Sequence, residues 1–394
     1  MSAVNLRHCT EGLLQFILQS RITEALEIDI GLSNDFCSQL LQSDPCLSSH
    51  STDSFEGVPP YPLYKRLGDS LYHSMISGTF QTTYNKMAML GVESSLKQKE
   101  EEWQKLISEK GSEIINMLNT VDFELHVQEP FFSQLKDGIK TVEGRCATGN
   151  YKRIGPGSLI LINKCIAFKV ECVCSYVSFS EMLEAEGLAK VLPGVKSVEE
   201  GVEIYRKFYT EEKERSNGVL GICVSKVTAQ PYISLASIIS ELSYGGLQYL
   251  LGLTNTKGTI ENALPPPRST LMSSFILPYR SNVKGSRLTH GARALGKHAH
   301  RSGNNYWGTL DGSDDNKNRI ALAAISHLIT HCCWLNVHIV PPHGDVFEIR
   351  VFKGYGARWS KDGSKFIGFL EPYTEDGHST GWKTPGRSLR NVVS

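Results

Sequence analysis

Six consecutive residues, Lys140 to Arg145 in the sequence KTVEGR, place four ionisable or hydroxyl side chains side by side. In an extended strand alternate residues point to opposite sides, so Lys140 faces away from Glu143 and Arg145. Gly144 and the twist of a strand end allow the two sets to meet at one rim. A lysine, a carboxylate and a guanidinium at one rim are suited to proton transfer or to holding a phosphate or carbonyl oxygen.

A second basic group follows within ten residues. Lys152 and Arg153 stand beside Tyr151, whose ring offers a face to a base. Basic side chains with an aromatic among them are the usual composition of a site for single-stranded RNA or a modified base. The residues predicted to bind substrate or RNA here are Thr141, Arg145, Tyr151, Lys152 and Arg153, with Lys140 at the same cleft.

Several elements must position these side chains. Phe123, Leu125 and Val127 alternate as in a half-buried strand, and a short helix is expected between Pro130 and Gly138. After a Gly-Pro-Gly turn the pattern predicts strands over 158–163 and 165–179, a helix over 180–188, helical sequence over 197–210 and a strand over 219–227.

The block GIKTVEGR, followed by these elements in this order, resembles the signature of the ASCH domain (activating signal cointegrator homology) over about residues 122–227. The resemblance implies a small β-barrel related to PUA RNA-binding domains. It also implies a role in RNA metabolism or transcription co-regulation, with RNA or a modified nucleoside in the barrel's cleft.

The resemblance further implies a catalytic alternative, because bacterial ASCH proteins include amidohydrolases that remove the acetyl group of N4-acetylcytidine. Their pattern is a lysine, a threonine three residues on and a distant glutamate. Lys140 matches the lysine, Glu143 occupies the threonine position, and Glu186 of the triplet AEG matches the distant glutamate. With a carboxylate in place of the threonine, either acyl transfer to water or a Lys–Glu ion pair at a binding cleft remains open. No cofactor is implied.

The chain as a whole has the composition of a globular protein, with 394 residues of which 40% are hydrophobic and 21% charged. Its zero net charge conceals an asymmetry. Residues 1–121 hold 9 Lys and Arg against 15 Asp and Glu, whereas residues 279–394 hold 16 against 9 and eight of the 12 histidines. We call residues 279–394 the rear region. Its basic, histidine-rich composition favours an anionic partner such as nucleic acid.

Four regions are expected. Residues 1–121 are acidic and mostly helical, and they are the candidate surface for a protein partner; residues 122–228 form the barrel. Residues 229–278 contain an apolar helix and a proline-rich linker, and residues 279–394 form a basic α+β domain with a disordered tail. This last region resembles an uncharacterised eukaryotic domain that accompanies ASCH in plant-like proteins, a resemblance that implies no chemistry.

The rear region carries its own candidate residues. His298 and His300 form an HxH pair that, on one strand face, would suit a metal with Glu348, His338 or His378 as third ligand; a basic nucleic-acid surface is the alternative. In the segment GYGARW, Arg358 offers a fork for phosphate and Trp359 a stacking face, and tight-turn packing is the alternative. The polar residues in strand-like sequence, which form either a structural network or a site, are Glu348, Arg350, Arg358, Glu371 and His378.

The sequence therefore predicts a multidomain α+β protein that binds RNA or a modified nucleoside. The alternatives are a hydrolase of an acylated nucleoside and a protein–protein adaptor. No apolar run is long enough to span a membrane, and ten scattered cysteines favour a reducing compartment, cytoplasm or nucleus.

Overall fold

The structure is a computed structural model that describes residues 4–44, 56–78, 94–256, 258–279, 287–299 and 306–372. The chain divides into two compact units, each described here by itself. Unit 1 comprises Met1–Ile30, Met75–Gly78 and Leu106–Ile239, and unit 2 comprises Gly31–Ser74, Thr79–Lys105 and Ser240–Ser394.

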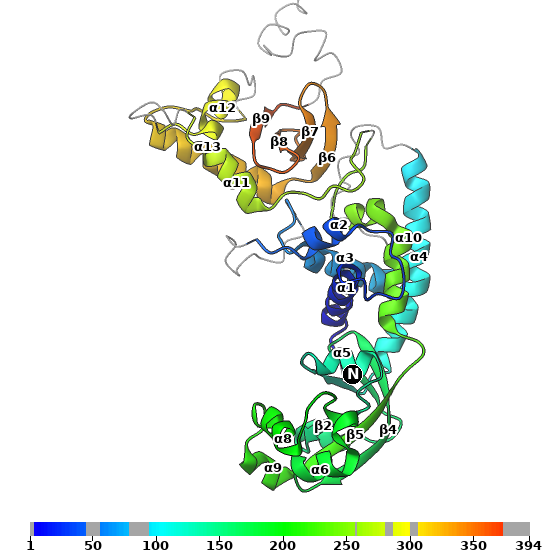
Figure 1. The fold of residues 1–394 in the computed structure, drawn as a ribbon. Coiled ribbons are helices and arrows are strands. Elements are labelled where there is room, and N and C mark those ends of the chain that lie inside the picture. Colours follow the sequence, from blue (N-terminus) through cyan, green and yellow to red (C-terminus); the bar gives the residue numbers. More distant parts are fainter. Residues whose placement is uncertain are drawn as a thin grey trace, which may run out of the picture. The chain divides into compact units, whose positions relative to one another are not determined.

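Mixed helices and strands make up both units (Figure 1). The helices are α1 (Leu6–Ile22), α2 (Asn34–Leu41), α3 (Leu63–Ser77), α4 (Ser94–Asn119), α5 (Phe131–Lys136), η1 (Gly149–Arg153), α6 (Phe179–Glu186), α7 (Leu188–Val191), α8 (Val198–Arg206), α9 (Glu211–Asn217), α10 (Pro231–Leu250), α11 (Arg268–Ile276), α12 (His290–Ala299) and α13 (Asp314–His331). The strands are β1 (Phe123–Leu125), β2 (Val142–Cys146), β3 (Leu159–Ile162), β4 (Ile166–Tyr176), β5 (Val219–Lys226), β6 (Trp334–Val340), β7 (Gly344–Arg350), β8 (Gly356–Ser360) and β9 (Phe366–Leu370).

Unit 1 is built around a five-stranded sheet with the order β1-β3-β4-β5-β2. Strand β1 pairs parallel with β3, and the other pairs are antiparallel. The register of β4 against β5 shifts between Val170 and Cys172, and such a bulge bends and twists the bulged strand. The sheet curls into a half-barrel whose inward strands, such as β3 with its run LILI, are buried.

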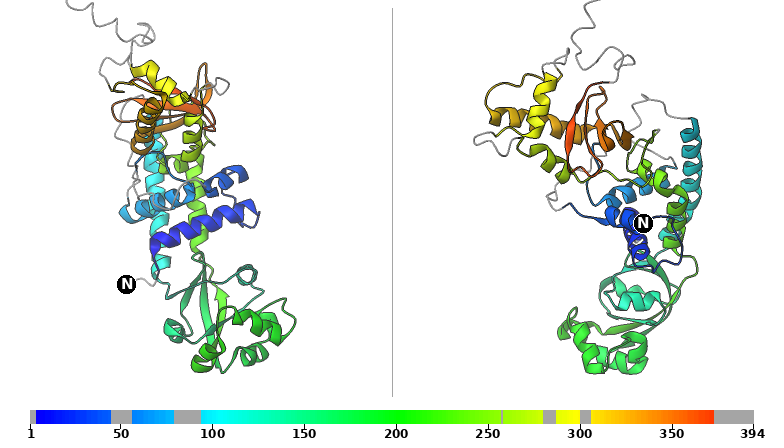
Figure 2. Two further views of the ribbon diagram at one scale, coloured as in Figure 1. Left: turned by 90° about the vertical axis from the view of Figure 1, so that its left-hand side faces the viewer. Right: turned by 45° about the horizontal axis from the view of Figure 1, so that its top comes forward.

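Short helices close one side of this half-barrel (Figure 2). Each begins at a hydroxyl that accepts a bond from a backbone N–H: Ser178 caps α6, Ser197 caps α8 and Thr210 caps α9. Phe179 at the start of α6 stacks on Tyr205 at the end of α8, with ring centroids 4.1 Å apart. The caps and this aromatic pair fix the helices against β2, β4 and β5.

Unit 2 contains a four-stranded antiparallel meander, β6-β7-β8-β9. Alternate residues of its strands are apolar and buried, including Val337, Phe347, Ile349 and Trp359. These side chains pack towards the helices, since Trp359 Nε1 donates to the Leu271 carbonyl of α11 and α12 packs on β9. The other face carries the polar side chains of Asn336, His338, Glu348, Arg350 and Arg358 beside the buried Trp334 and Val346.

The observed elements confirm an α+β protein with several folded parts and correct some expected boundaries. The sequence pattern predicts strands over 334–340 and 347–352. Strand β6 has the first pair of limits, but β7 begins at Gly344 and ends at Arg350. The helical sequence predicted over 197–210 ends at Arg206, and Thr210 starts a separate helix. Lys140 precedes β2 instead of lying in it, so strand alternation does not decide which way it points.

Gly144 of β2 tests this packing. A Cβ at Gly144 would lie 2.4 Å from Tyr205 Oη and 2.7 Å from the end of Met182, so Gly144→Ala must displace the Phe179–Tyr205 pair. We expect a loss of about 1–3 kcal/mol, the usual cost of overpacking, seen as faster hydrogen exchange in β2 and β5. Gly155→Ala is the matched control, because nothing lies within 4 Å of its Cβ position. Equal exchange in the two variants would contradict this account.

Candidate functional site

Lys140 is the most deeply buried cation of unit 1, with 2% of its surface exposed. Two backbone hydrogen bonds fix its position. Its backbone N–H donates to the Gln134 carbonyl of α5, and the next N–H donates to the Lys190 carbonyl of α7. The side chain therefore enters the half-barrel between α5 and α7.

The Lys140 ammonium has three acceptors. Nζ lies 2.6 Å from the Val142 carbonyl oxygen and 3.2 Å from Glu143 Oε2, and it also donates to the Val191 carbonyl. Burial lowers the pKa of Lys140, and the Glu143 carboxylate works against that shift. Three acceptors around one nitrogen match the three hydrogens of the charged form, which has no lone pair to act as a base.

Glu143 is shared by a second cation. Arg145 Nη2 lies 2.9 Å from Glu143 Oε1 and also donates to the His126 carbonyl. Burial lowers the pKa of Arg145, but Glu143 and Tyr209 more than compensate, so its pKa is raised. We call Lys140, Glu143 and Arg145 the Lys140 cluster. It holds two cations around one buried carboxylate, and Arg145 Nε is buried with no hydrogen-bond partner.

Aromatic side chains flank the Arg145 guanidinium. Its carbon lies 6.0 Å from the centre of the Tyr151 ring. Tyr209, whose pKa burial raises, is hydrogen-bonded to Arg145 on another side. Tyr151 lies in η1, and its neighbours Lys152 and Arg153 are exposed at the end of the same turn. The structure thus places Tyr151 near Arg145, with Lys152 and Arg153 following Tyr151 in the same turn.

Two predicted residues lie apart from this arrangement. Glu186 Oε1 accepts a hydrogen bond of 2.6 Å from Tyr176 Oη, and it would lie 3.4 Å from a Cβ at Gly221. Its contacts therefore lie at the end of β4 and on β5. Thr141 takes part through its backbone, because its carbonyl accepts from Val224 N. Tyr205 and Tyr209 were missed by the sequence reasoning, although their spacing of four residues near a helix end was visible.

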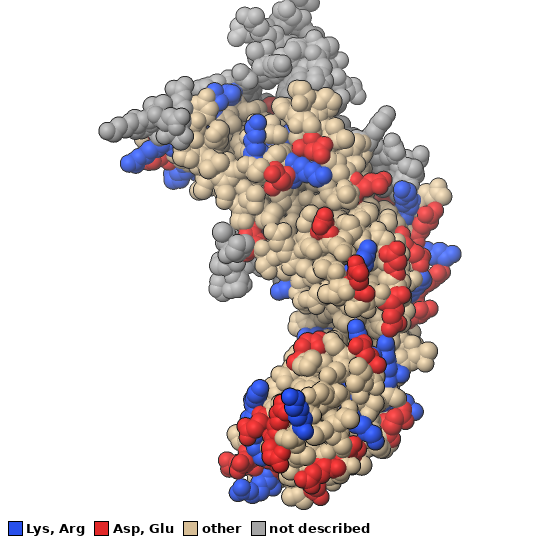
Figure 3. Space-filling model, in the orientation of Figure 1, with Lys and Arg blue, Asp and Glu red and all other residues tan. Residues whose placement is uncertain are grey.

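Charged side chains of both signs lie on the surface of unit 1. On the face drawn in Figure 3, acidic and basic side chains are intermixed over the half-barrel and its helices. An extended basic surface is absent from that face.

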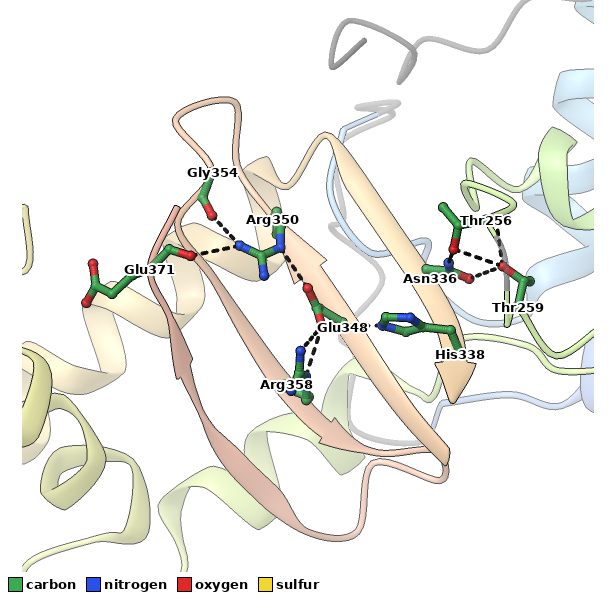
Figure 4. Close-up of polar contacts among 9 residues, drawn as sticks. All are labelled: Thr256, Thr259, Asn336, His338, Glu348, Arg350, Gly354, Arg358 and Glu371. Atoms are coloured by element: carbon green, nitrogen blue, oxygen red, sulfur yellow. Dashed lines mark hydrogen bonds and ion pairs between the residues drawn. The ribbon is translucent and has the colours of Figure 1, made fainter. Parts of the chain in front are cut away.

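The polar face of the unit 2 sheet holds a second group, which Figure 4 draws. Glu348 of β7 is 2% exposed and lies opposite Arg358 of β8. Arg358 donates to Glu348 Oε2 through Nε (2.9 Å) and Nη2 (2.5 Å), and Arg350 Nε donates to Oε1 at 2.7 Å. His338 Nε2 of β6 lies 3.3 Å from Oε2. We call His338, Glu348, Arg350 and Arg358 the Glu348 cluster.

Further bonds hold this cluster rigidly. Arg350 Nη1 also donates to the carbonyls of Gly354 and Glu371, which ties β7 to the turn before β8 and to the end of β9. Asn336, fully buried opposite Glu348, is bonded to Thr256 and Thr259 (Figure 4). Of the polar residues for which the sequence left a structural network or a site open, Glu348, Arg350 and Arg358 are hydrogen-bonded together, and the Glu371 carbonyl accepts from Arg350. His378 lies outside the described residues.

Two predictions for the rear region need correction. Trp359 has no exposed surface and packs between Phe347 and Phe366, so it offers no face to a base. The prediction that the HxH pair lies on a strand is wrong for His298, because this residue lies in α12. His300 and His378 fall outside the described residues.

The contacts of His298 are with protein groups. His298 Nδ1 and Trp307 Nε1 both lie 2.9 Å from Glu371 Oε1, an arrangement that joins α12 to the end of β9. Within the part of the chain that the structure describes, no three His, Cys, Asp or Glu side chains are grouped to hold a metal ion.

Comparison with known proteins gives two family matches. Residues 125–228 match the ASCH domain, and residues 279–371 match the CdiA C-terminal tRNase toxin domain. The match supports an ASCH domain over residues 125–228, a PUA-like fold of the RNA-binding kind. The expected likeness of the rear region to a plant-like domain stays a prediction, since the match found there is to the toxin domain.

Solved structures similar to the chain are short proteins. The hypothetical protein PH0355 and the protein PF0455 from Pyrococcus furiosus are each 42% identical to it. Each match covers 27% of this chain and 98% of the other, with TM-scores of 0.26 and 0.25. No curated protein matches the chain. Among the described residues, no helix has the length and apolar character needed to cross a bilayer.

The Glu348 cluster predicts a pH dependence. Burial raises the pKa of Glu348, but the bonds from His338, Arg350 and Arg358 outweigh it and bring this pKa to about 2. A depressed carboxyl pKa stabilises the fold above the unfolded-state pKa, and the gain disappears as pH falls towards 2. We expect unit 2 to lose roughly 3 kcal/mol of unfolding free energy between pH 6 and pH 2 through this group.

Tryptophan fluorescence can follow this loss, because all five tryptophans belong to unit 2. Urea unfolding at several pH values should show the dependence in the wild type and in Asp345→Asn, whose carboxylate is half-exposed. Glu348→Gln should lack it. The same pH slope in Glu348→Gln and wild type would refute the assignment.

Proposed function

We propose that the protein binds RNA, or a modified nucleoside within RNA, at the Lys140 cluster of its ASCH domain. The observation that carries this proposal is the partly buried Arg145 side chain, which lies near the Tyr151 ring, is hydrogen-bonded to Tyr209 and has its Nε without a partner. A phosphate oxygen or a base carbonyl would complete its hydrogen bonds.

The charge balance of the cluster supports an anionic ligand. Lys140 and Arg145 share the single carboxylate of Glu143, so one positive charge stays uncompensated in a largely buried place. Uncompensated buried charge is costly, and a phosphate group relieves the cost. Tyr151 supplies the stacking surface, while Lys152 and Arg153 extend the positive charge towards solvent.

The hydrolytic alternative receives less support from this geometry. Lys140 uses all three of its hydrogens on protein acceptors, and Glu186 is bonded to Tyr176. Neither group is free to activate a water at the cluster. Turnover of N4-acetylcytidine by the pure protein would reverse this preference. The adaptor role of residues 1–121 stays a prediction, because none of the contacts described above tests it.

A second candidate function belongs to the rear of the chain. Residues 279–371 match a domain family described as a tRNase toxin, and unit 2 carries a polar sheet face with two arginines and a histidine. We infer that this part of the chain acts on RNA, with tRNA as the first substrate class to test. An incubation of the full chain with a total tRNA pool, followed by gel analysis, tests it directly.

Arg145 is the residue to change in the ASCH domain. Arg145→Gln removes the guanidinium fork, and we expect affinity for a short fluorescent single-stranded RNA to fall about tenfold or more, measured by anisotropy. Arg215→Gln is the matched control: this arginine, in the same unit, is 82% exposed and lies 3.9 Å from one glutamate. Equal affinities of the two variants would count against the proposal.

A separate prediction concerns Lys152 and Arg153 and the salt dependence of RNA binding. Both are exposed, so replacing both by Gln leaves the buried cluster intact. If each contacts one phosphate, the slope of log affinity against log salt should become shallower by about 1.4. An unchanged slope would mean that RNA does not reach this turn.

A further inference from the structure

We propose that the Glu348 cluster is a site for cleaving RNA phosphodiester bonds, with His338 as the proton-transfer residue and Arg350 and Arg358 as the phosphate-binding residues. This inference rests on the proposed action of residues 279–371 on RNA and names the residues and the reaction class.

Strand register brings the four side chains to one place. Glu348 lies on β7 between Asn336 on β6 and Arg358 on β8, and His338 is two residues along β6 from Asn336. All project from the face opposite the apolar core. Figure 4 shows the two guanidinium groups and the imidazole converging on the Glu348 carboxylate from three strands.

The arginines keep donors for a ligand. Arg358 uses Nε and Nη2 on Glu348, and Arg350 uses Nε and Nη1 on protein oxygens. Among the described residues, Arg358 Nη1 and Arg350 Nη2 have no acceptor. The side chains of both arginines are partly exposed, at 15% and 13%. Two guanidinium groups against one carboxylate leave a positive charge suited to a phosphodiester.

Glu348 is an unsuitable proton acceptor, since its two oxygens already accept from two arginines and face His338. Its role is to orient the His338 ring. When His338 donates from Nε2 to Glu348, the lone pair of the neutral ring lies on Nδ1, which has no partner among the described residues. His338 is 15% exposed, so a substrate hydroxyl can approach it.

The reaction that fits these groups is transesterification. The imidazole of His338 takes the proton of a ribose 2′-hydroxyl, and the 2′-oxygen attacks the neighbouring phosphorus. The bond from phosphorus to the 5′-oxygen breaks, and the imidazolium returns the proton to that oxygen. The products are a 2′,3′-cyclic phosphate and a 5′-hydroxyl, with no other reactant needed. The arginines stabilise the charge that develops on phosphorus oxygens.

The experiment compares full-length variants on a total tRNA pool and on an oligoribonucleotide cut by the wild type. His338→Gln keeps a donor for Glu348 but cannot relay a proton, and its cleavage rate should fall at least about 100-fold. Arg358→Lys keeps the charge but loses the fork, and should cut about tenfold more slowly. His343→Gln, which changes an exposed histidine in the turn between β6 and β7, should cut as the wild type does. Thermal unfolding by tryptophan fluorescence verifies that all variants fold.

The outcomes distinguish the proposed site from RNA cleavage by the protein as such. Cleavage by the wild type that persists at full rate in His338→Gln would overturn this site while leaving RNA cleavage by the protein intact. Absence of cleavage in the wild type would overturn both. Cleavage of an oligonucleotide with 2′-deoxyribose at the cut position, or products ending in a 3′-hydroxyl, would overturn the transesterification.

Discussion

A buried carboxylate held between two cations occurs in each unit of this protein, and the local structure depends on it. In unit 1 Glu143 joins Lys140 and Arg145, and in unit 2 Glu348 joins Arg350 and Arg358. Burying a charge is expensive, so a carboxylate in either place must be paired and hydrogen-bonded. Removing the carboxylate would leave two cations without their anionic partner.

The same arrangement explains why both places suit an anion. One carboxylate balances one cation, and the second cation keeps an excess of positive charge where water is scarce. In such surroundings a phosphate interacts more strongly than at an exposed lysine. The backbone positions are fixed before a ligand arrives, by α5 and α7 around Lys140 and by Asn336 and Glu371 around the Glu348 cluster. Preorganised donors of this kind lose little entropy on binding.

The sequence indicated the Lys140 cluster because its members lie within six residues and sit next to predictable strands. It could not place Glu186, since a helix that packs on the sheet can direct a carboxylate to either end, and here Tyr176 captures it. Strand alternation also could not predict the direction of the Lys140 side chain, because the carbonyls of Val142 in β2 and Val191 in α7 hold its ammonium.

The rear region was harder to predict. Trp359 and Arg358 are neighbours in an extended strand, so they face opposite sides, and only the register against β7 decides which side is the core. His298 lies in a helix whose start is fixed by the Thr289 hydroxyl, a cap that the sequence reasoning passed over. The residues of the Glu348 cluster come from three strands. The sequence shows that these residues are polar, but it does not show which strands pair, so it could not predict that the side chains meet.

The measurement that tests the central claim most directly is ultraviolet cross-linking of the full chain to RNA, with the cross-linked peptides mapped by mass spectrometry. The account predicts cross-links at Tyr151 or Tyr209 in the ASCH domain and on β6 to β8 around His338. Cross-links confined to α1 to α4, with none at either cluster, would contradict it.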